Sequence, residues 1–294
     1  MSADALDVVV LGGRGMLGTD LVGALRRHPA FDRVEVADLP EVDVTRLDPL
    51  LALLRRSRPD VVVNCAAFTD VDGCEGRPEH AFAVNAVGAG NAATAAEAVG
   101  AHIVHISTDY VFDGRKGAPY VEEDPPAPLS VYGKSKLEGE HRVAAVSRWT
   151  IVRTAWLYGR HGDNFVHRIL ARAREKREIL GVTDQVGSPT WTRDLSLALI
   201  AIIERGATGL FHAANAGACS RYEQICHMLR CADIPVEVRP VDSAAFPRPA
   251  AIPPNSALDC SRLAKVTGHA MRPWRDALRE YVLELMRSPG PAFA

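Results

Sequence analysis

A tyrosine and a lysine four residues apart, Tyr132 and Lys136, have the types and spacing needed for proton transfer to an oxygen atom. They fall at the start of a predicted helix, and residues four apart share one helix face, so the ammonium can lie near the phenol. A free phenol has a pKa of about 10, and a neighbouring cation favours phenolate, which brings proton transfer into range near neutral pH. Taken alone, the spacing fits a surface Tyr–Lys pair equally well.

A second segment places hydroxyl groups at the end of a predicted buried strand. Ser107, Thr108 and Asp109 follow the apolar run at 101–106. Because the carboxyl ends of parallel strands meet at one edge of the sheet, Thr108 can there hydrogen-bond a substrate carbonyl oxygen beside Tyr132. The two segments together predict a site that holds a carbonyl oxygen and gives it a proton.

The third segment is glycine-rich and lies between a predicted strand at 7–12 and a predicted helix. Its glycines allow a tight turn and let backbone N–H groups approach a pyrophosphate at the helix N-terminus. The spacing fits both Gly13-x-Gly15-x-x-Gly18 and Gly12-x-x-Gly15-x-x-Gly18, so it predicts dinucleotide binding without choosing a superfamily.

Two residues bear on the choice of cofactor. Asp38 ends the second predicted strand, at the offset where an acid usually bonds the adenosine ribose, which favours NAD. Arg14 can accept the 2′-phosphate of NADP. Because the two signals conflict, we expect the protein to use both NADH and NADPH.

The elements that must position these residues alternate through the first half of the chain. Short β-branched runs predict strands at 7–12, 33–38, 60–66, 101–107 and 150–156, and helical spacing predicts helices at about 16–25, 48–56, 80–99 and from 130. This order predicts an α/β fold with a Rossmann-type doubly wound parallel sheet, in which residues 1–155 form a dinucleotide-binding domain.

The rest of the chain, 156–294, is predicted to form mainly a smaller α/β substrate-binding lobe, with segments at about 185–215 returning to the first domain. Ser220 and Glu223 form a capping box for a helix at 222–232, and 274–286 is a second amphipathic helix. The Pro-rich stretch at 246–254 is predicted to be a loop. Open α/β sheets bind ligands at their carboxyl edge, so we expect the active site between the two parts.

Composition restricts the partners. The 294 residues carry 34 Lys and Arg against 36 Asp and Glu, and a net charge of −2 gives no electrostatic reason to expect nucleic acid or an anionic membrane. The sequence has no run of about 18–20 apolar residues and no basic signal region, which predicts a cytoplasmic protein. The six cysteines lack metal spacing and are interpreted as small buried residues, so we predict no metal site.

Taken together, the motifs identify the chain as similar to the extended short-chain dehydrogenases and, more narrowly, to the dTDP-4-dehydrorhamnose reductase family. The resemblance extends along nearly the whole chain and is carried by STDYVFDG (107–114), YGKSKLEGE (132–140) and DQVGSPT (184–190), with weaker support from 64–75, 84–91, 153–159, 164–165 and 255–259. It implies NAD(P)H-dependent reduction of the 4-keto group of a dTDP-activated 6-deoxy-sugar, with Thr108, Tyr132 and Lys136 as the catalytic residues.

The resemblance also implies a set of binding residues. Those implied for the substrate are Thr69, Val71, Thr108, Asp109, Trp156 as an apolar wall over the sugar ring, and Asn164 near the nucleotide end. Those implied for the cofactor are Gly12, Arg14, Gly15, Met16, Leu17, Gly18, Asp38, Asp43, Val44, Ala66, Ala67, Tyr132 and Lys136. For Trp156 a core indole is the alternative. Some relatives bridge subunits through a carboxylate-bound metal, and although Asp20 matches one ligand, Arg193 stands where another acid is expected.

Three alternatives are weighed against this function. Nucleotide-sugar dehydratases carry an Asp-Glu pair after the threonine, whereas this chain has Asp109-Tyr110, so a simple ketone reduction is favoured. Epimerases share the Tyr/Lys pair but commonly run longer and lack two of the specific segments. A non-catalytic subunit resembling the methionine adenosyltransferase regulatory subunits remains a rival. The sequence leaves open which sugar is reduced and whether the protein is a monomer or a homodimer.

Overall fold

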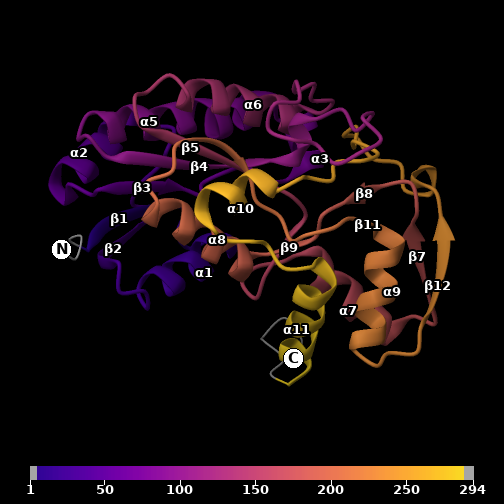
Figure 1. Ribbon diagram of the computed structural model, residues 1–294. Coiled ribbons are helices and arrows are strands. Elements are labelled where there is room, and N and C mark those ends of the chain that lie inside the picture. The colour runs from indigo at the N-terminus through magenta and orange to yellow at the C-terminus, as the bar shows by residue number, and fades with distance from the viewer. Residues whose placement is uncertain (1–4, 288–294) are drawn as a thin grey trace.

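Six short runs of mostly buried residues form one parallel sheet in the computed structural model, which describes residues 5–287. The strand order is β10-β5-β4-β3-β1-β2, and all neighbours are parallel (Figure 1). The strands are β1 (Leu6–Leu11), β2 (Phe31–Ala37), β3 (Val61–Asn64), β4 (His102–Thr108), β5 (Trp149–Thr154) and β10 (Gly209–His212). The predicted doubly wound α/β fold is therefore confirmed.

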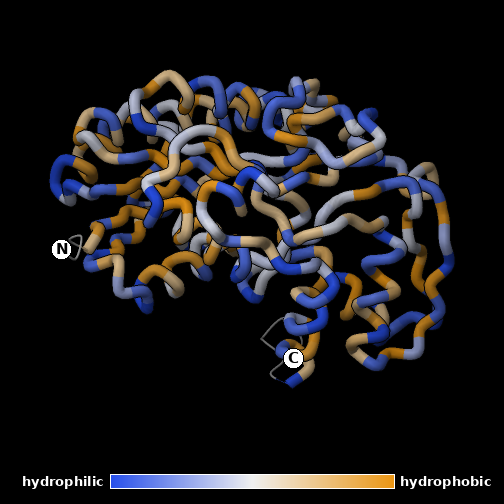
Figure 2. The backbone as a smooth tube through the Cα atoms, in the orientation of Figure 1, coloured by the Kyte–Doolittle hydropathy of each residue, from blue (hydrophilic) through white to orange (hydrophobic). Residues whose placement is uncertain are grey.

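Helices cover both faces of this sheet because its strands are apolar on both sides. In β1, Val8 and Val10 pack against α1 (Met16–Leu25) and α8 (Thr192–Glu204), while Val9 and Leu11 face the opposite layer. That layer contains α2 (Leu47–Ser57), α5 (Ala89–Glu97) and α6 (Val131–Val143). Apolar segments accordingly run through the middle of the sheet in Figure 2.

The helix predicted at 80–99 is interrupted. It consists of α4 (Pro78–Phe82), a π-helical turn at Ala83–Gly88 and α5, preceded by the short α3 (Val71–Gly76). Asn85 lies in the wide turn and its amide bonds Phe68 O and Ser135 Oγ, both at 3.0 Å. Wide turns of this kind are frequent at functional sites, and this one ties the loop after β3 to α6.

A second lobe lies at one end of the sheet (Figure 1). Its core is formed by α7 (Phe165–Glu175), α9 (Arg221–Cys231) and α11 (Trp274–Arg287). The predicted capping box at Ser220 and Glu223 is confirmed at the start of α9. The remaining elements are β6 (Leu157–Tyr158), β7 (Glu178–Val182), β8 (Val186–Gly187), β9 (Thr190–Trp191), β11 (Cys219–Ser220), β12 (Glu237–Val241), α10 (Ser261–Thr267) and 3-10 turns at Asp109–Val111 and Ser243–Ala245.

The chain crosses between the two parts more than once. After β6, α7 and β7 it returns to the sheet, where α8 packs against α1 and β10 pairs with β5. It then builds most of the second lobe. The sheet is therefore completed by residues that follow the first visit to that lobe.

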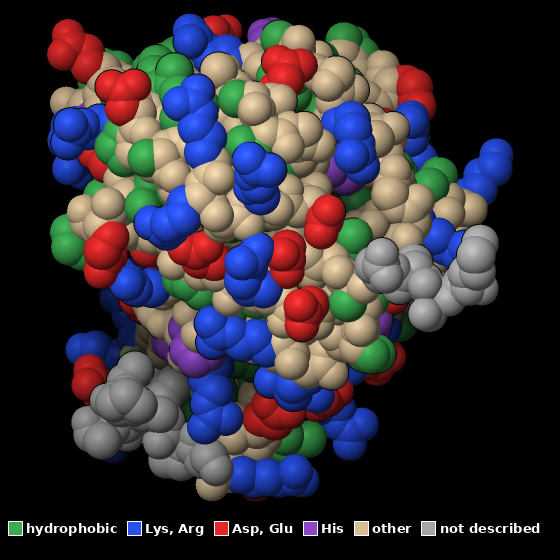
Figure 3. Space-filling model, turned by 90° about the vertical axis from the view of Figure 1, so that its left-hand side faces the viewer, with side chains coloured by type: hydrophobic (Ala, Val, Ile, Leu, Met, Phe, Trp, Pro, Cys, Tyr) green, Lys and Arg blue, Asp and Glu red, His purple; other side chains and the backbone are tan. Residues whose placement is uncertain are grey.

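The surface carries both charge signs interspersed on the face shown in Figure 3. No helix within residues 5–287 combines the length and apolar character that crossing a membrane requires. All six cysteines are free; Cys74 and Cys219 are buried as predicted, whereas Cys65, Cys226, Cys231 and Cys260 are only partly buried.

Candidate active site

The strand order reverses between β1 and β3, because the chain leaves β1 for β2 on one side and then crosses to β3 on the other. Ligands of open α/β sheets bind at such a point, outside the carboxyl ends of the strands. A cavity of about 360 Å³ lies there, and it is lined by Gly12, Arg14, Gly15, Asp38, Leu39, Val42, Asp43, Val44, Cys65, Ala66, Ala67 and Val84. Most residues that the sequence assigned to the cofactor thus meet in one place.

The glycines shape this cavity by close approach of backbones. Gly12 has φ +69°, and a Cβ there would lie 2.6 Å from Ala66 N; a Cβ on Gly18 would lie 2.3 Å from Gly12 O. Gly15 caps α1 without a side-chain hydrogen bond, so the first amides of the helix keep their N–H groups for a ligand. These features fit the pyrophosphate of a dinucleotide. Met16 is partly buried and Leu17 is buried at the start of α1.

Asp38 and Arg14 are neighbours in the lining of this cavity. Asp38 accepts hydrogen bonds from Arg14 N and Leu39 N, both at 2.8 Å. The Arg14 guanidinium bonds the exposed Glu41 at 2.7 Å and 3.1 Å, which raises the pKa of Arg14 and lowers that of Glu41. A 2′-phosphate would therefore have to compete with Glu41 for this guanidinium.

Tyr132 lies in the first turn of α6, which begins there because Ser130 Oγ accepts a hydrogen bond from Gly133 N at 3.1 Å. Its side chain is 9% exposed and packs with Val71 and Tyr110. Burial raises the pKa of the Tyr132 phenol well above 10, and the Thr108 hydroxyl beside it offsets only part of that rise. The phenol is therefore protonated at neutral pH and can act as a proton donor.

Lys136 lies one turn further along and is 2% exposed. Its ammonium donates to Ile106 O at 2.7 Å and lies 3.4 Å from His105 Nε2. Burial lowers the pKa of Lys136 to about 8. The sequence predicted that Lys136 lowers the pKa of the Tyr132 phenol and favours phenolate. In the structure burial decides the pKa of the phenol and raises it, while the Lys136 ammonium binds the backbone of β4.

A buried ion pair that sequence reasoning missed anchors α6 to the sheet. Glu140 forms two hydrogen bonds with Arg153 of β5, at 2.9 Å and 2.7 Å, and accepts Ser107 Oγ at 2.5 Å. Both side chains of the ion pair are about 95% buried. Since Glu140 lies one turn after Lys136, this contact fixes the helix that carries Tyr132 and Lys136. In the sequence, Glu140 ends the YGKSKLEGE motif (132–140) and Arg153 lies in the fifth predicted strand.

Two predicted substrate residues, Val71 and Asp109, lie beside Tyr132, and a third, Thr69, lies on the loop that leads to Val71. Thr69 is exposed and Val71 is partly buried where the loop after β3 enters α3. Asp109 follows β4, is 1% exposed, and accepts hydrogen bonds from Thr108 Oγ1 at 3.0 Å and Ser256 Oγ at 2.5 Å. Burial raises the pKa of Asp109 to about 6.

Trp156 and Asn164 differ from one another in what they offer a ligand. Trp156 has φ +48°, a strained conformation of the kind that clusters at functional sites, and a Cβ on Gly187 would lie 2.3 Å from its indole. Asn164 caps α7 through Val166 N and His167 N, and its amide donates to Gly159 O at 2.8 Å. The structure thus gives Asn164 a capping role, and its contact with the nucleotide stays a prediction.

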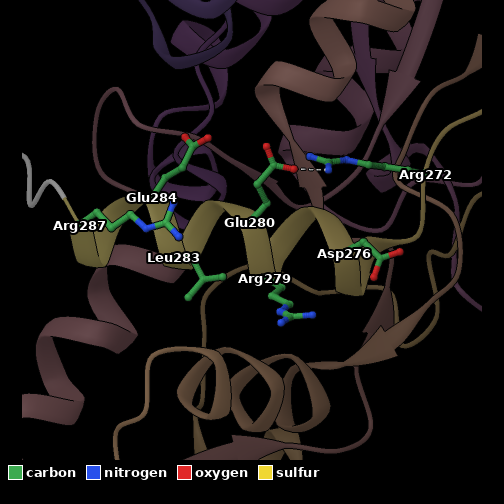
Figure 4. Close-up of a pocket in the computed structure, with 7 residues that line it drawn as sticks. All are labelled: Arg272, Asp276, Arg279, Glu280, Leu283, Glu284 and Arg287. Carbon is green, nitrogen blue, oxygen red and sulfur yellow. Dashed lines mark hydrogen bonds and ion pairs between the residues drawn. The ribbon is translucent and has the colours of Figure 1, made fainter.

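A second hollow of about 420 Å³ runs along α11 and is lined by charged side chains (Figure 4). Arg272 bonds Glu280, and Arg193 pairs with Glu280 and Glu284 at 3.5 Å and 2.9 Å. Arg193, which stands where the resemblance would place a metal-binding acid, therefore neutralises two carboxylates instead. Within residues 5–287, no three His, Cys, Asp or Glu side chains are grouped to hold a metal ion.

Comparison with known proteins agrees with this geometry. A family model described as RmlD substrate binding domain matches residues 6–287. The dTDP-4-dehydrorhamnose reductase of Mycobacterium tuberculosis is 42% identical over 279 residues, which cover 92% of this chain and 90% of the relative.

Two solved structures also match, each across 95% of this chain and 99% of their own. A dTDP-4-dehydrorhamnose reductase from Clostridium acetobutylicum has 40% identity and a TM-score of 0.92. One from Bacillus anthracis, in complex with NADP, has 35% identity and a TM-score of 0.91. These matches favour a reductase over the epimerase and regulatory-subunit alternatives. The chain belongs to the RmlD substrate binding domain family.

Proposed function

We propose that this protein reduces the 4-keto group of a dTDP-activated 6-deoxy-hexose with NADPH or NADH. The observation that carries the proposal is the meeting of Tyr132, Thr108 and Asp109 at the edge of the sheet that also holds the cavity lined by the glycine-rich turn. The family supports dTDP-4-dehydrorhamnose as the substrate and dTDP-rhamnose as the product.

The chemistry assigned to the chain is proton donation and orientation. The reduced nicotinamide supplies the hydride, as in all reductases of this kind. Tyr132, whose pKa is raised by burial, gives its proton to the alkoxide that forms at the sugar C4. Thr108 holds that oxygen through its hydroxyl. Lys136, one helical turn after Tyr132, binds the nicotinamide ribose.

The cofactor assignment rests on the adenosine end of the cavity. Asp38 offers a carboxylate to a ribose hydroxyl, and Arg14 offers a guanidinium that can exchange Glu41 for a 2′-phosphate. A relative binds NADP, which supports NADPH. We expect use of both cofactors, tested by comparing kcat/KM for NADPH and NADH; a preference above about a hundredfold, or about 2.7 kcal/mol, refutes dual use.

The decisive experiment is to follow NADPH oxidation with dTDP-4-keto-6-deoxy-glucose, with and without a 3,5-epimerase, and to identify the product by NMR. We expect turnover and a product reduced at C4. Turnover only with the epimerase assigns the rhamnose series, and turnover without it assigns another deoxysugar. No oxidation with either substrate contradicts the proposal. A cytoplasmic location and a monomeric or homodimeric state stay predictions.

A further inference from the structure

Arg221, the first residue of α9, lies against the predicted substrate wall. Its guanidinium carbon is 3.3 Å from the centroid of the Trp156 ring and 4.6 Å from that of Phe165. Because the Ser220–Glu223 capping box fixes the start of α9, the arginine is anchored at its backbone as well as stacked at its head. The guanidinium is therefore held in one place before a ligand arrives.

The charge of Arg221 is not neutralised. Within residues 5–287 no carboxylate lies at ion-pair distance from it, and its side-chain hydrogen bond goes to the neutral Gln224 Oε1 at 3.0 Å. Asp109 acts on it only through space, since the oxygens of that carboxylate accept Thr108 and Ser256. Burial lowers the pKa of Arg221 to about 10, yet it stays cationic at neutral pH.

Other arginines in the protein contrast with this one. Buried Arg153 has Glu140, and Arg272 has both Asp194 and Glu280. Arg248, a second cation close enough to affect Arg221, is paired with Asp72 at 2.9 Å. Arg221 is partly buried, and a guanidinium in such a place without a carboxylate partner gains from an anionic ligand.

The position of Arg221 indicates which part of the substrate it can bind. Tyr110 and Asp109 lie close enough to affect the arginine electrostatically, so it stands on the same side as the catalytic end of β4. In a hexose whose C4 faces Tyr132, the C1 substituent leaves from the opposite side of the ring, toward the second lobe, to which α9 belongs. The cofactor pyrophosphate belongs at the other site, the start of α1.

We propose that Arg221 binds the diphosphate of the nucleotide-sugar substrate, so that the stacked guanidinium sets substrate affinity and places the sugar against Trp156. Guanidinium and phosphate match in charge and in their planar, bidentate hydrogen-bond geometry. This inference rests on the proposed function, because it takes the nucleotide sugar as the substrate.

The test compares Arg221→Gln with Arg221→Lys and with a matched control, Arg275→Gln. Arg275 also stacks on an indole, that of Trp274 at 4.5 Å, but it is exposed on α11. For Arg221→Gln we expect KM for the dTDP-sugar and Kd for dTDP to rise about 10- to 100-fold, as for a lost hydrogen bond to a charged group. Arg221→Lys should lie between it and the wild type.

Thymidine and NADPH serve as internal references in the same titrations. Both should bind Arg221→Gln as they bind the wild type, and NADPH binding also reports that the variant is folded. An unchanged dTDP Kd in Arg221→Gln, or an equal loss for thymidine, overturns the diphosphate assignment while the reductase function stands. If Arg221→Gln fails to fold, a wild-type dTDP Kd in Arg221→Lys overturns it instead. A wild type that neither binds dTDP nor turns over keto-sugar overturns the proposed function itself.

Discussion

Burial shifts the pKa values of Tyr132 and Lys136, the two side chains proposed to be catalytic, in opposite directions. It raises the pKa of the Tyr132 phenol and lowers that of Lys136 to about 8, because burial favours the neutral form of each group. The neutral form is the protonated phenol for Tyr132 and the deprotonated amine for Lys136. The phenol therefore keeps its proton through neutral pH, as the proposed proton donor must. Such a donor suits reduction better than the reverse oxidation, which needs a base.

Removal of this proton donor is the first prediction. Tyr132→Phe keeps the ring that packs with Val71 and Tyr110 and deletes only the hydroxyl. We expect kcat to fall about 10²- to 10⁴-fold, the usual contribution of general acid catalysis, with the Kd for NADPH unchanged. The kcat is measured from turnover with dTDP-4-keto-6-deoxy-glucose, and the Kd for NADPH is measured by fluorescence titration. Near-normal turnover would refute the role of Tyr132.

The buried carboxyl of Asp109 makes the second prediction, on stability against pH. Its folded pKa of about 6 exceeds the ordinary 3.8, so between about pH 4 and pH 6 the folded protein keeps a proton that the unfolded chain has released. The free energy of unfolding therefore falls as pH rises through this window, and the ionised carboxylate is unfavourable at pH 7.

Asp109→Asn keeps an acceptor oxygen for Ser256 without the charge. We expect it to raise the free energy of unfolding at pH 7 by about 1–2 kcal/mol and to have no such effect below about pH 4, measured by urea denaturation. Asp113→Asn is the control, since hydrogen bonds to Arg115 N and Tyr120 lower the pKa of Asp113 and it should give no gain. An equal gain from Asp109→Asn at both pH values would contradict the prediction.

At the scale of the elements, α6 is held on the sheet by contacts that the hydrophobic periodicity of its own sequence does not predict. Its Tyr–Lys face is held by Glu140, which joins α6 to Arg153 of β5 and to Ser107 of β4. Breaking a buried ion pair by removing one partner leaves the other charge unpaired in a poorly solvated place.

Glu140→Ala is therefore expected to lower the free energy of unfolding by about 3–5 kcal/mol in urea denaturation. The double variant Glu140→Leu/Arg153→Met, which removes both charges, should recover most of that loss. Glu138→Ala on the same helix breaks an exposed pair with Arg142 and should cost less than about 1 kcal/mol. If Glu140→Ala is as mild as Glu138→Ala, the ion pair does not anchor α6.

The sequence predicted elements well where they repeat a local pattern and less well where distant groups decide. The β-branched runs predict all strands of the sheet but β10, and the glycine spacing predicts the tight turn that lines the cavity after β1. The π-helical turn was not predicted, because it depends on Asn85 reaching Phe68 and Ser135. Arg221 was also missed: it is an ordinary first residue of a capped helix until folding places it on Trp156.

At the scale of the whole molecule, the shared sheet predicts that both parts unfold together. Trp149 lies in β5 and Trp274 in the second-lobe core, so tryptophan fluorescence reports both. We expect one transition, coincident with that in circular dichroism, shifted as a whole by NADPH by about 2.7 kcal/mol at a hundredfold excess over Kd. A separate transition that NADPH does not move would contradict this coupling.

The pairing of β10 with β5 has a consequence for dividing this protein. A fragment ending at 155 would contain the residues that line the proposed cofactor cavity, but it would expose the open edge of β5, whose unpaired N–H and C=O groups invite pairing with other chains. Exchange of the substrate lobe between relatives therefore cannot use a single crossover after β5. A chimaera needs three junctions, one after β5 and one on each side of the segment that contains α8 and β10, so that the host keeps its own sixth strand.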